Sequence, residues 1–349
     1  MQRFDYRRET TAESAARVLG AALAEGGFFA PEGPRTPARQ RAQLIAGGTN
    51  MTDYMTLDVV QPQLLIDING LAAGHSRIEA NTHGLRLGAL VRMSQAEDDP
   101  AIRAEYPVIY ETLMLAASRQ IRNMASLGGN VLQRTRCEYF RERSWPCNKR
   151  MPGSGCAAME GLNRQHAILG TSEQCIATYA GDFAQALIAL DAMVETVSAS
   201  GTRRFAFEKL HRLPGNTPEI ETTLAPDEVI TAIEVPAGPW TRRSHYVKVR
   251  DRESYQFALA SAAVALHMDG EIVREARIAL GGVATVPWRA REAEQLLKGK
   301  VLDVAAAGKA ASAAFEDASV RAHNAFKVTT GKDTLVRALM ETRDMELRP

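Results

Sequence analysis

Four cysteines that lie close together in the sequence constrain this chain more than any other feature. Cys137, Cys147, Cys156 and Cys175 have the spacing C-x9-C-x8-C-x18-C, and no cysteine occurs elsewhere in the chain. Structural zinc sites usually contain a C-x2-4-C pair, because one tight turn then supplies two ligands with tetrahedral geometry. No such pair is present, so the spacing favours an iron-sulfur cluster on an irregular loop over a zinc ion. Disulfide bonds and unligated thiols are the other interpretations that the cysteines alone allow.

Basic and turn-forming residues surround these cysteines. A cluster held by four thiolates carries negative charge, which nearby cations and backbone N–H groups stabilise. The segment supplies the cations Arg134, Arg136, Arg141, Arg143, Lys149 and Arg150 against the acids Glu138 and Glu142. Turns that would let the backbone curl around a cluster are predicted at Pro146, Pro152, Gly153 and Gly155. His166 also lies in the segment, but four thiolates complete a cuboidal site, so we do not expect it to ligate iron.

Length and composition place the chain among ordinary globular proteins. Its 349 residues suggest two domains, possibly three. With 45% hydrophobic and 24% charged residues, it is unlike disordered or collagen-like chains. The near-equal numbers of basic residues (42) and acidic residues (41) give no support for nucleic-acid binding. The longest apolar stretch, 257–266, is far shorter than the ~20 residues that span a bilayer, so we expect no membrane segment, and we expect no export signal in this chain.

Hydrophobic patterns predict strands and helices that alternate without a regular βαβ rhythm. A capping box at Thr10 and Glu13 begins the first predicted helix, which Gly26 and Gly27 end, and a proline-rich loop follows between Phe28 and Gln43. Strands are predicted at 44–46, 64–70, 85–91, 193–199 and 228–235, and helices at 107–117 and 183–190. Beyond a boundary at 236–239, we expect an antiparallel sheet over 245–283 with a turn at 268–270, and then helices at 287–299, 304–315 and 333–344.

Two glycine-rich turns have the composition of phosphate-binding loops. Gly47-Gly48-Thr49-Asn50 follows a predicted buried strand, and the second turn is the sequence SLGGN, 126–130. Without Cβ atoms the backbone approaches a ligand closely, and successive N–H groups can point at phosphate oxygens. A tight turn that binds nothing is the simpler interpretation of either turn alone. Two such turns together favour a dinucleotide site, although neither matches the Rossmann fingerprint.

With these turns, and with HYVKVRD (245–251) and ALGGVATVPWRA (279–290), the chain resembles the FAD-binding subunits of the xanthine dehydrogenase and molybdenum hydroxylase family. The resemblance covers nearly the whole length. It implies an α+β fold: a vanillyl-alcohol-oxidase-like FAD-binding domain over 1–236, with an insertion at about 133–176, and a smaller α+β domain over 240–349 of the type found at the C-terminus of CO dehydrogenase flavoproteins.

The resemblance also implies which residues contact FAD. They are Leu44, Ile45, Ala46, Gly47, Gly48, Thr49, Asn50 and Met51 of the first turn, Ser126, Gly128, Gly129 and Asn130 of the second, and Asp182, Ile230 and Lys248. Two of them have simpler interpretations, because Asp182 precedes a predicted helix as an N-cap and Lys248 alternates with valines as an outward strand residue. A lysine beside the pyrimidine edge of the flavin would favour the anionic reduced form.

The cysteine segment is the main departure from the family pattern. Family members usually place the aspartate shortly after the GGN motif, whereas Asp182 follows Asn130 by 52 residues. The insertion resembles that of the few subfamilies whose flavin subunit also holds a [4Fe-4S] cluster, above all the three-subunit periplasmic aldehyde oxidoreductases. The implied ligands are the four cysteines. The benzoyl-CoA reductase type, which also carries an inserted cluster, is the nearest rival.

The resemblance implies an electron-transfer role without catalytic residues in this chain. Aldehyde oxidation would occur on a large molybdenum-cofactor subunit, and electrons would pass through a small [2Fe-2S] subunit to FAD and then to an external acceptor. The implied location is the periplasm, reached by co-export with a signal-bearing partner, with the cytoplasm as the alternative. Two other classes are a self-sufficient NAD(P)H-linked flavin reductase and a zinc-stabilised RNA-binding module, and the neutral charge argues against the second.

Overall fold

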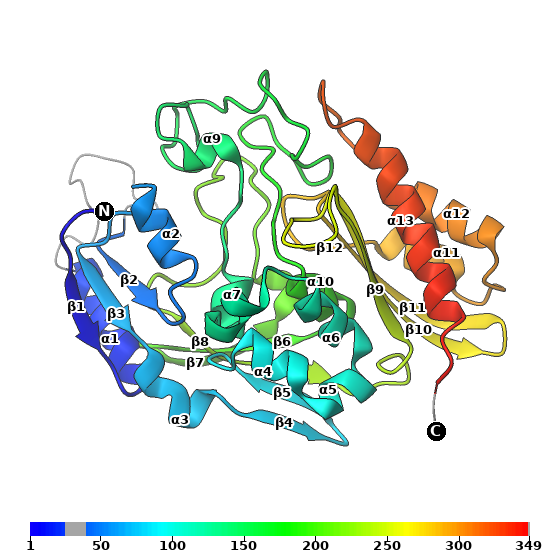
Figure 1. Cartoon of the computed structure of the whole chain (residues 1–349), viewed down its shortest axis with the longest axis horizontal. Helices are drawn as coiled ribbons and strands as arrows, with labels where there is room; N and C mark the ends of the chain where they lie inside the picture. Colours follow the sequence, from blue (N-terminus) through cyan, green and yellow to red (C-terminus); the bar gives the residue numbers. More distant parts are fainter. Residues whose placement is uncertain (25–39, 348–349) are drawn as a thin grey trace.

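A computed structural model describes residues 1–24 and 40–347 of the chain (Figure 1). Most of the proline-rich loop predicted between Phe28 and Gln43 lies outside the described residues. Three sheets make up the fold: a three-stranded sheet near the N-terminus, a five-stranded central sheet and a four-stranded C-terminal sheet. Within the described residues, no helix combines the length and the apolar character needed to cross a bilayer.

The N-terminal part is a small parallel sheet packed on a helix. Its elements are β1 (Asp5–Arg8), α1 (Ala12–Ala24), β2 (Ala42–Ile45), α2 (Met51–Thr56) and β3 (Leu64–Asp67), and the strand order is β1-β3-β2. The predicted capping box of Thr10 and Glu13 is wrong, because Thr11 caps α1: its Oγ1 accepts the backbone N–H of Ser14 at 3.1 Å. Buried alanines of α1 pack against β2, β3 and the central strands β6 and β8, so the small sheet is fixed to the central one.

The central part is an antiparallel sheet covered by short helices. Its strands are β4 (Ile78–Asn81), β5 (Gly84–Gly88), β6 (Met193–Ser198), β7 (Gly201–Ala206) and β8 (Val229–Pro236), in the order β4-β5-β8-β6-β7. The helices are η2 (Asn69–Leu71), α3 (Ala72–His75), α4 (Met93–Asp98), α5 (Pro100–Glu105), α6 (Pro107–Met114), α7 (Arg119–Met124), α8 (Leu127–Val131), α10 (Phe183–Ala189) and η3 (Phe207–Lys209). The second glycine turn predicted at 126–130 is therefore wrong as a free turn, since most of it forms α8.

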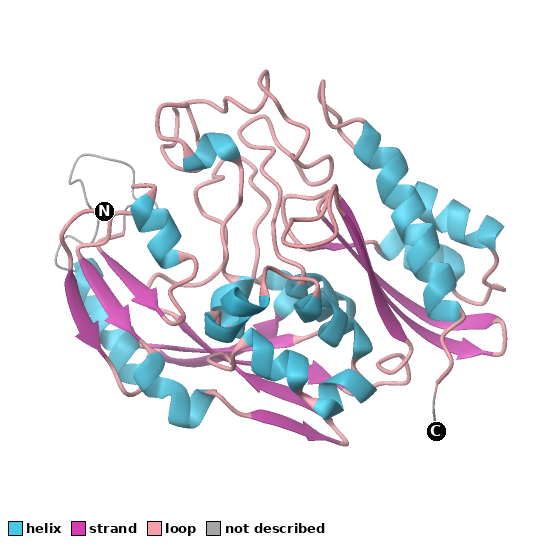
Figure 2. Ribbon diagram, viewed as in Figure 1, coloured by secondary structure: helices cyan, strands magenta, loops and turns pink. Residues whose placement is uncertain are grey.

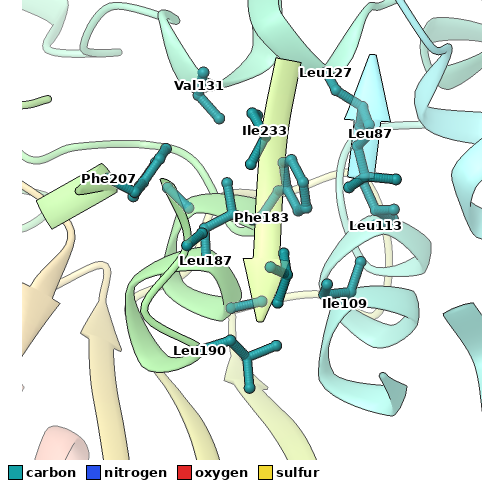
Figure 3. Close-up of a cluster of buried hydrophobic side chains, with 14 of the residues drawn as sticks. Leu87, Ile109, Leu113, Leu127, Val131, Phe183, Leu187, Leu190, Phe207 and Ile233 are labelled. Atoms are coloured by element: carbon teal, nitrogen blue, oxygen red, sulfur yellow. The ribbon is translucent and has the colours of Figure 1, made fainter. Parts of the chain in front are cut away.

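The core of this part gathers around α10 (Figure 3). Every residue of α10 is buried, because the helix lies between the central sheet and the C-terminal sheet. The cluster combines apolar side chains of α10 with those of α6, α8, η3, β5 and β8. Its members include Leu87, Ile109, Leu113, Leu127, Val131, Phe183, Leu187, Leu190, Phe207 and Ile233. This packing fixes the start of α10, where Asp182 lies.

The cysteine segment (133–176) is almost entirely irregular, as the sequence predicts (Figure 2). It contains one short helix, α9 (Glu138–Arg141), and isolated bridges that pair Cys147 with Cys156 and Ser172 with Cys175. Its C-terminal end is held by the C-terminal part, because the N–H groups of Ile168 and Leu169 donate to Val283 O. In Figure 1 the segment stands above the central sheet, between the N-terminal and C-terminal parts.

The C-terminal part is an antiparallel sheet with helices on both faces. Its elements are β9 (Ser244–Val249), β10 (Ala260–Asp269), β11 (Ile272–Gly281), β12 (Trp288–Arg289), α11 (Arg291–Leu297), α12 (Val304–Ala314) and α13 (Phe326–Arg343), and the strand order is β12-β11-β10-β9. The helices α11, α12 and α13 form one group on the sheet, and α6 and α10 of the central part pack against it as well. The hairpin turns at Gly270, whose φ of +57° suits glycine.

Two C-terminal helices differ from the predicted bounds. The helix predicted at 287–299 begins only at Arg291, after the short strand β12. The helix predicted at 333–344 is α13, which begins earlier, at Phe326. The added turns contain Thr329, Thr330 and Gly331, which are poor helix formers, so tertiary packing decides their conformation. A Cβ atom on Gly331 would lie 2.3 Å from the ring of Phe315, which shows how closely α13 packs on the end of α12.

We expect Gly331→Ala to destabilise the protein by about 1–3 kcal/mol, because overpacking against the Phe315 ring outweighs the better helix propensity of alanine. Gly308→Ala in α12 is the matched control, since no atom lies within 4 Å of its added Cβ and the change should stabilise by up to about 1 kcal/mol. Urea unfolding of both variants measures the difference. Equal free energies of unfolding for the two variants would contradict the close approach of Gly331 to the Phe315 ring.

Candidate functional site

A cavity of about 1550 Å³ lies between the N-terminal sheet, α2, α8, the cysteine segment and the C-terminal part. Every residue predicted to contact FAD lines it. These residues come from separate elements, namely the end of β2 and the loop after it, α8, the start of α10, β8 and β9. The tertiary structure thus brings all of them to one space.

The first glycine loop presents unused backbone donors to this cavity. Within the described part of the chain, the N–H groups of Gly47, Gly48, Thr49 and Asn50 donate to no protein atom. Gly48 has a φ of +75°, which strains any other residue. A Cβ on Gly47 would lie 1.8 Å from Met124 O, so only glycine lets this loop lie against the end of α7. The loop therefore combines free N–H donors with a close backbone approach, which are the features expected of a phosphate-binding loop.

The second glycine segment has a different role, which corrects the prediction that its N–H groups grip phosphate. The N–H groups of Leu127 and Gly128 donate to Val91 O (2.9 Å) and Ala89 O (2.8 Å). Those of Gly129 and Asn130 donate to Ser126 Oγ (3.2 Å) and Ser126 O (2.8 Å), so Ser126 caps α8. The segment still lines the cavity with Asn130, whose Oδ1 atom is buried and has no hydrogen-bond partner in the part of the chain that the structure describes. A buried amide oxygen without a partner is costly, which indicates a ligand group or water at this position.

Asp182 and Lys248 form a buried ion pair at the cavity wall. Lys248 Nζ donates to Asp182 Oδ2 at 2.7 Å and to Leu115 O at 3.1 Å, and the Tyr246 hydroxyl donates to Asp182 Oδ1 at 2.6 Å. The two charged side chains are 6% and 1% exposed. Asp182 occupies the N-cap position of α10, but its side chain makes no capping hydrogen bond, so the capping interpretation is wrong. The charge of Lys248 is balanced by this aspartate, and the interpretation as an outward strand residue is also wrong.

Ile230 reaches the cavity through an irregularity in β8. Thr196 pairs with Ile230 and Glu195 pairs with Ala232, so Thr231 is an extra residue that forms a β-bulge. Ile230 is 7% exposed and lines the cavity.

Several cavity residues were not assigned to the flavin site from the sequence. Tyr54 of α2, His211 and Phe257 line the cavity, and Arg136 reaches it from the cysteine segment. Burial lowers the pKa of His211 to about 4, and the Nε2–H of its ring donates to Val131 O at 2.9 Å. No local motif marks Tyr54, His211 or Phe257, whereas Arg136 was predicted to balance the charge of the cluster.

All four cysteines line one small second cavity, together with Phe140, Lys149 and Gln174 among others. None of them forms a disulfide bond, which removes that interpretation. Burial raises the pKa of Cys137 to about 12 and that of Cys175 to about 11, so metal binding here would release protons. Among the residues that the structure describes, no three histidine, cysteine, aspartate or glutamate side chains are grouped closely enough to hold a metal ion. His166 Nε2 lies 3.2 Å from Cys137 Sγ.

Most cations of the segment bind acids or carbonyls instead of facing the thiols, which corrects their predicted role. Arg141 makes a bidentate pair with Asp53 of α2 (2.6 and 2.9 Å), and Arg143 pairs with Asp58. Arg150 donates to backbone carbonyls of the segment. Further ion pairs join Arg134 and Lys149 to Glu221, the latter at 3.1 Å. Lys149 lines the cysteine cavity, and its charge opposes the rise in the pKa of Cys175.

Comparisons with known proteins agree with this architecture. Residues 32–238 match the family described as FAD binding domain in molybdopterin dehydrogenase, and residues 245–342 match the CO dehydrogenase flavoprotein C-terminal domain. The chain belongs to this family of flavin domains. The family resemblance and the α+β fold expected from the sequence are thereby confirmed, and the protein is an oxidoreductase of the molybdenum hydroxylase family.

Individual relatives cover most of the chain. It is 46% identical to the aldehyde oxidoreductase FAD-binding subunit PaoB of Escherichia coli (strain K12), over 86% of this chain and 92% of that one. It is 26% identical to the carbon monoxide dehydrogenase medium chain of Afipia carboxidovorans, over 89% and 85% of the two chains. The crystal structure of quinoline 2-oxidoreductase from Pseudomonas putida 86 shares the fold, with a TM-score of 0.72 over 99% of each chain at 21% identity.

The cavity fits FAD, the cofactor of this family. The free N–H groups of the first glycine loop and the unpartnered Asn130 oxygen are the kind of polar groups that a dinucleotide binds, and they open on the same space. When bound, FAD exchanges electrons singly or in pairs.

We expect Lys248→Met to lower the free energy of unfolding by about 3–5 kcal/mol, because the buried Asp182 carboxylate loses its cation. Adding Asp182→Asn should restore part of the loss. Arg143→Met is the control, since it removes an exposed ion pair that contributes at most about 1 kcal/mol. Urea unfolding without added flavin is the measurement. Similar decreases in the free energy of unfolding for Lys248→Met and Arg143→Met would contradict the buried pair.

Proposed function

We propose that this chain is the flavin-binding, electron-transferring subunit of a molybdenum-dependent aldehyde oxidoreductase. The observation that carries the proposal is the 46% identity with the E. coli FAD-binding subunit, over 86% of this chain, joined to a cavity lined by every expected flavin contact. Aldehyde oxidation then takes place on a molybdenum-cofactor subunit. A [2Fe-2S] subunit passes the electrons to FAD in this chain, and an external acceptor removes them.

We further propose that FAD lies in the large cavity with its phosphates at the first glycine loop. The support is local, because four consecutive N–H groups of this loop have no protein partner among the described residues, and the backbone conformation at Gly48 and the close approach at Gly47 both require glycine. The Asp182 and Lys248 pair lies on the same cavity and carries no net charge. Its role toward FAD is therefore hydrogen bonding and shape, in place of the stabilisation of the anionic reduced flavin expected from Lys248, because Asp182 balances the lysine's charge.

We also propose that the four cysteines hold a [4Fe-4S] cluster. The support is that all four line one small cavity on an irregular segment, and four thiolates are the ligand set of a cuboidal cluster. The neighbouring charges suit an anionic group. Lys149 lines the cysteine cavity and shares the carboxylate of Glu221 with Arg134, and within the described residues Arg134 Nη2 is buried without a hydrogen-bond partner.

Replacing Gly48 by valine tests the flavin site. We expect the purified variant to lose most of its FAD while keeping its fold, because a β-branched residue is strained at a φ of +75° and the loop can no longer present its N–H groups. Gly270→Val is the control, with a similar φ of +57° in a hairpin distant from the cavity lining. Flavin release and absorbance give the occupancy, and full occupancy in Gly48→Val would refute the phosphate assignment.

Iron and acid-labile sulfide analysis tests the cluster. We expect about four irons and four sulfides per native chain, their loss in Cys147→Ser, and protease sensitivity of the variant between about 133 and 176, because the segment has little regular structure of its own. FAD should be lost only in part, since the first glycine loop lies outside the segment. Zinc in the native protein, or iron retained in the variant, would contradict the proposal.

A further inference from the structure

Arg136 and Arg150 are the two cations of the cysteine segment that have no acidic partner among the described residues, and of these two only Arg136 lines the flavin cavity. Arg134, Arg141, Arg143 and Lys149 pair with carboxylates, and Arg150 is occupied by carbonyls. The nearby carboxylate of Asp53 already accepts both N–H groups of the Arg141 fork. A guanidinium keeps its charge at any physiological pH, so Arg136 contributes an uncompensated positive charge.

The side chain of Arg136 extends into the flavin cavity. Its Nη2 donates to Asn50 Oδ1 at 2.8 Å, and its Nη1 donates to the Tyr54 hydroxyl at 2.8 Å and to Arg134 O at 2.7 Å. The guanidinium carbon lies 5.7 Å from the centre of the Tyr54 ring and 5.3 Å from that of Phe257. All of these partners except the carbonyl are neutral side chains, and Asn50 is the last residue of the first glycine loop.

This position places a cation beside the unused N–H groups of Gly47, Gly48 and Thr49. The diphosphate of a flavin nucleotide carries about two negative charges, which partial charges on one loop compensate incompletely. The N–H groups of Leu127, Gly128, Gly129 and Asn130 in the second glycine segment already donate within the protein, so they are not free to bind phosphate. The cavity therefore needs a full charge near the first loop, and Arg136 supplies one.

We propose that Arg136 binds the diphosphate of the flavin nucleotide, so that the cysteine segment contributes a binding residue to the flavin site. The inference rests on the proposed function, because it takes FAD to occupy this cavity. Arg136 directly precedes Cys137, whose N–H donates to Thr135 Oγ1 at 3.1 Å, and that hydroxyl donates to Thr178 O at 3.0 Å. These bonds join the two ends of the segment at its base, so an ordered segment positions Arg136.

The test compares FAD with riboflavin, which has the same ring system but no phosphate. Full-length protein, purified with its partner subunits and stripped of flavin, is titrated with each ligand while flavin fluorescence is followed. We expect Arg136→Met to raise the Kd for FAD about 10- to 100-fold and to change the Kd for riboflavin less than about threefold. Arg136→Lys should recover part of the FAD affinity, since it restores the charge without the planar fork.

Arg143→Met is the matched control, because Arg143 lies in the same segment but pairs with Asp58, and it should bind both flavins as the native protein does. Unchanged FAD affinity in Arg136→Met would overturn the proposal. Equal weakening of both flavins would also overturn it, because Arg136 would then shape the ring pocket. The Gly48→Val variant distinguishes a failure of the Arg136 proposal from a failure of the proposed function. If Gly48→Val keeps its FAD, the assignment of the flavin to this cavity is itself wrong.

Discussion

The buried pair of Asp182 and Lys248 joins the two parts of the protein that enclose the flavin cavity. Asp182 begins α10, in the core of the central part, whereas Lys248 and Tyr246 lie on β9 of the C-terminal sheet. Two charges that are removed from water need good hydrogen-bond geometry to compensate for the loss of solvation. Here the Asp182 carboxylate accepts one hydrogen bond from Lys248 and one from Tyr246. Together with the packing of α10 on β10 and β11, this contact fixes the C-terminal sheet against α10, and with it one wall of the cavity.

The cysteine segment is ordered by its surroundings, since it has little secondary structure of its own. Arg141 and Arg143 tie it to the N-terminal part. On the other side, the buried Lys327 of α13 donates to Gln165 O (3.1 Å) and Gly282 O (2.6 Å), which joins the segment to the C-terminal part. The flavin cavity and the cysteine cavity also share lining residues, among them Cys137 and Cys175. An insertion in this position therefore forms part of the flavin cavity's wall.

Much of the site was predictable because its residues lie in local motifs. The GGTN loop, the SLGGN segment and the clustered cysteines can each be recognised within a few residues, and all of them line one of the two cavities. The conformation of the SLGGN segment and the start of α13 were less predictable. The SLGGN segment is a capped helix start because Ala89 and Val91 supply acceptors from a distant part of the chain, and α13 starts early because it packs on Phe315. Such partners leave no trace in the local sequence.

The sequence by itself determined the family, the α+β character and the identity of the glycine loop and the thiols, because glycine and cysteine have properties that no neighbour can replace. Only the tertiary structure decided how charges are paired. Asp182 neutralises Lys248, Glu221 is shared by two cations, and Arg136 bonds to Asn50 with no acidic partner in the described part of the chain. The physical reason is that ion pairing depends on distances of a few ångströms between residues far apart in the chain, which spacing along the sequence does not encode.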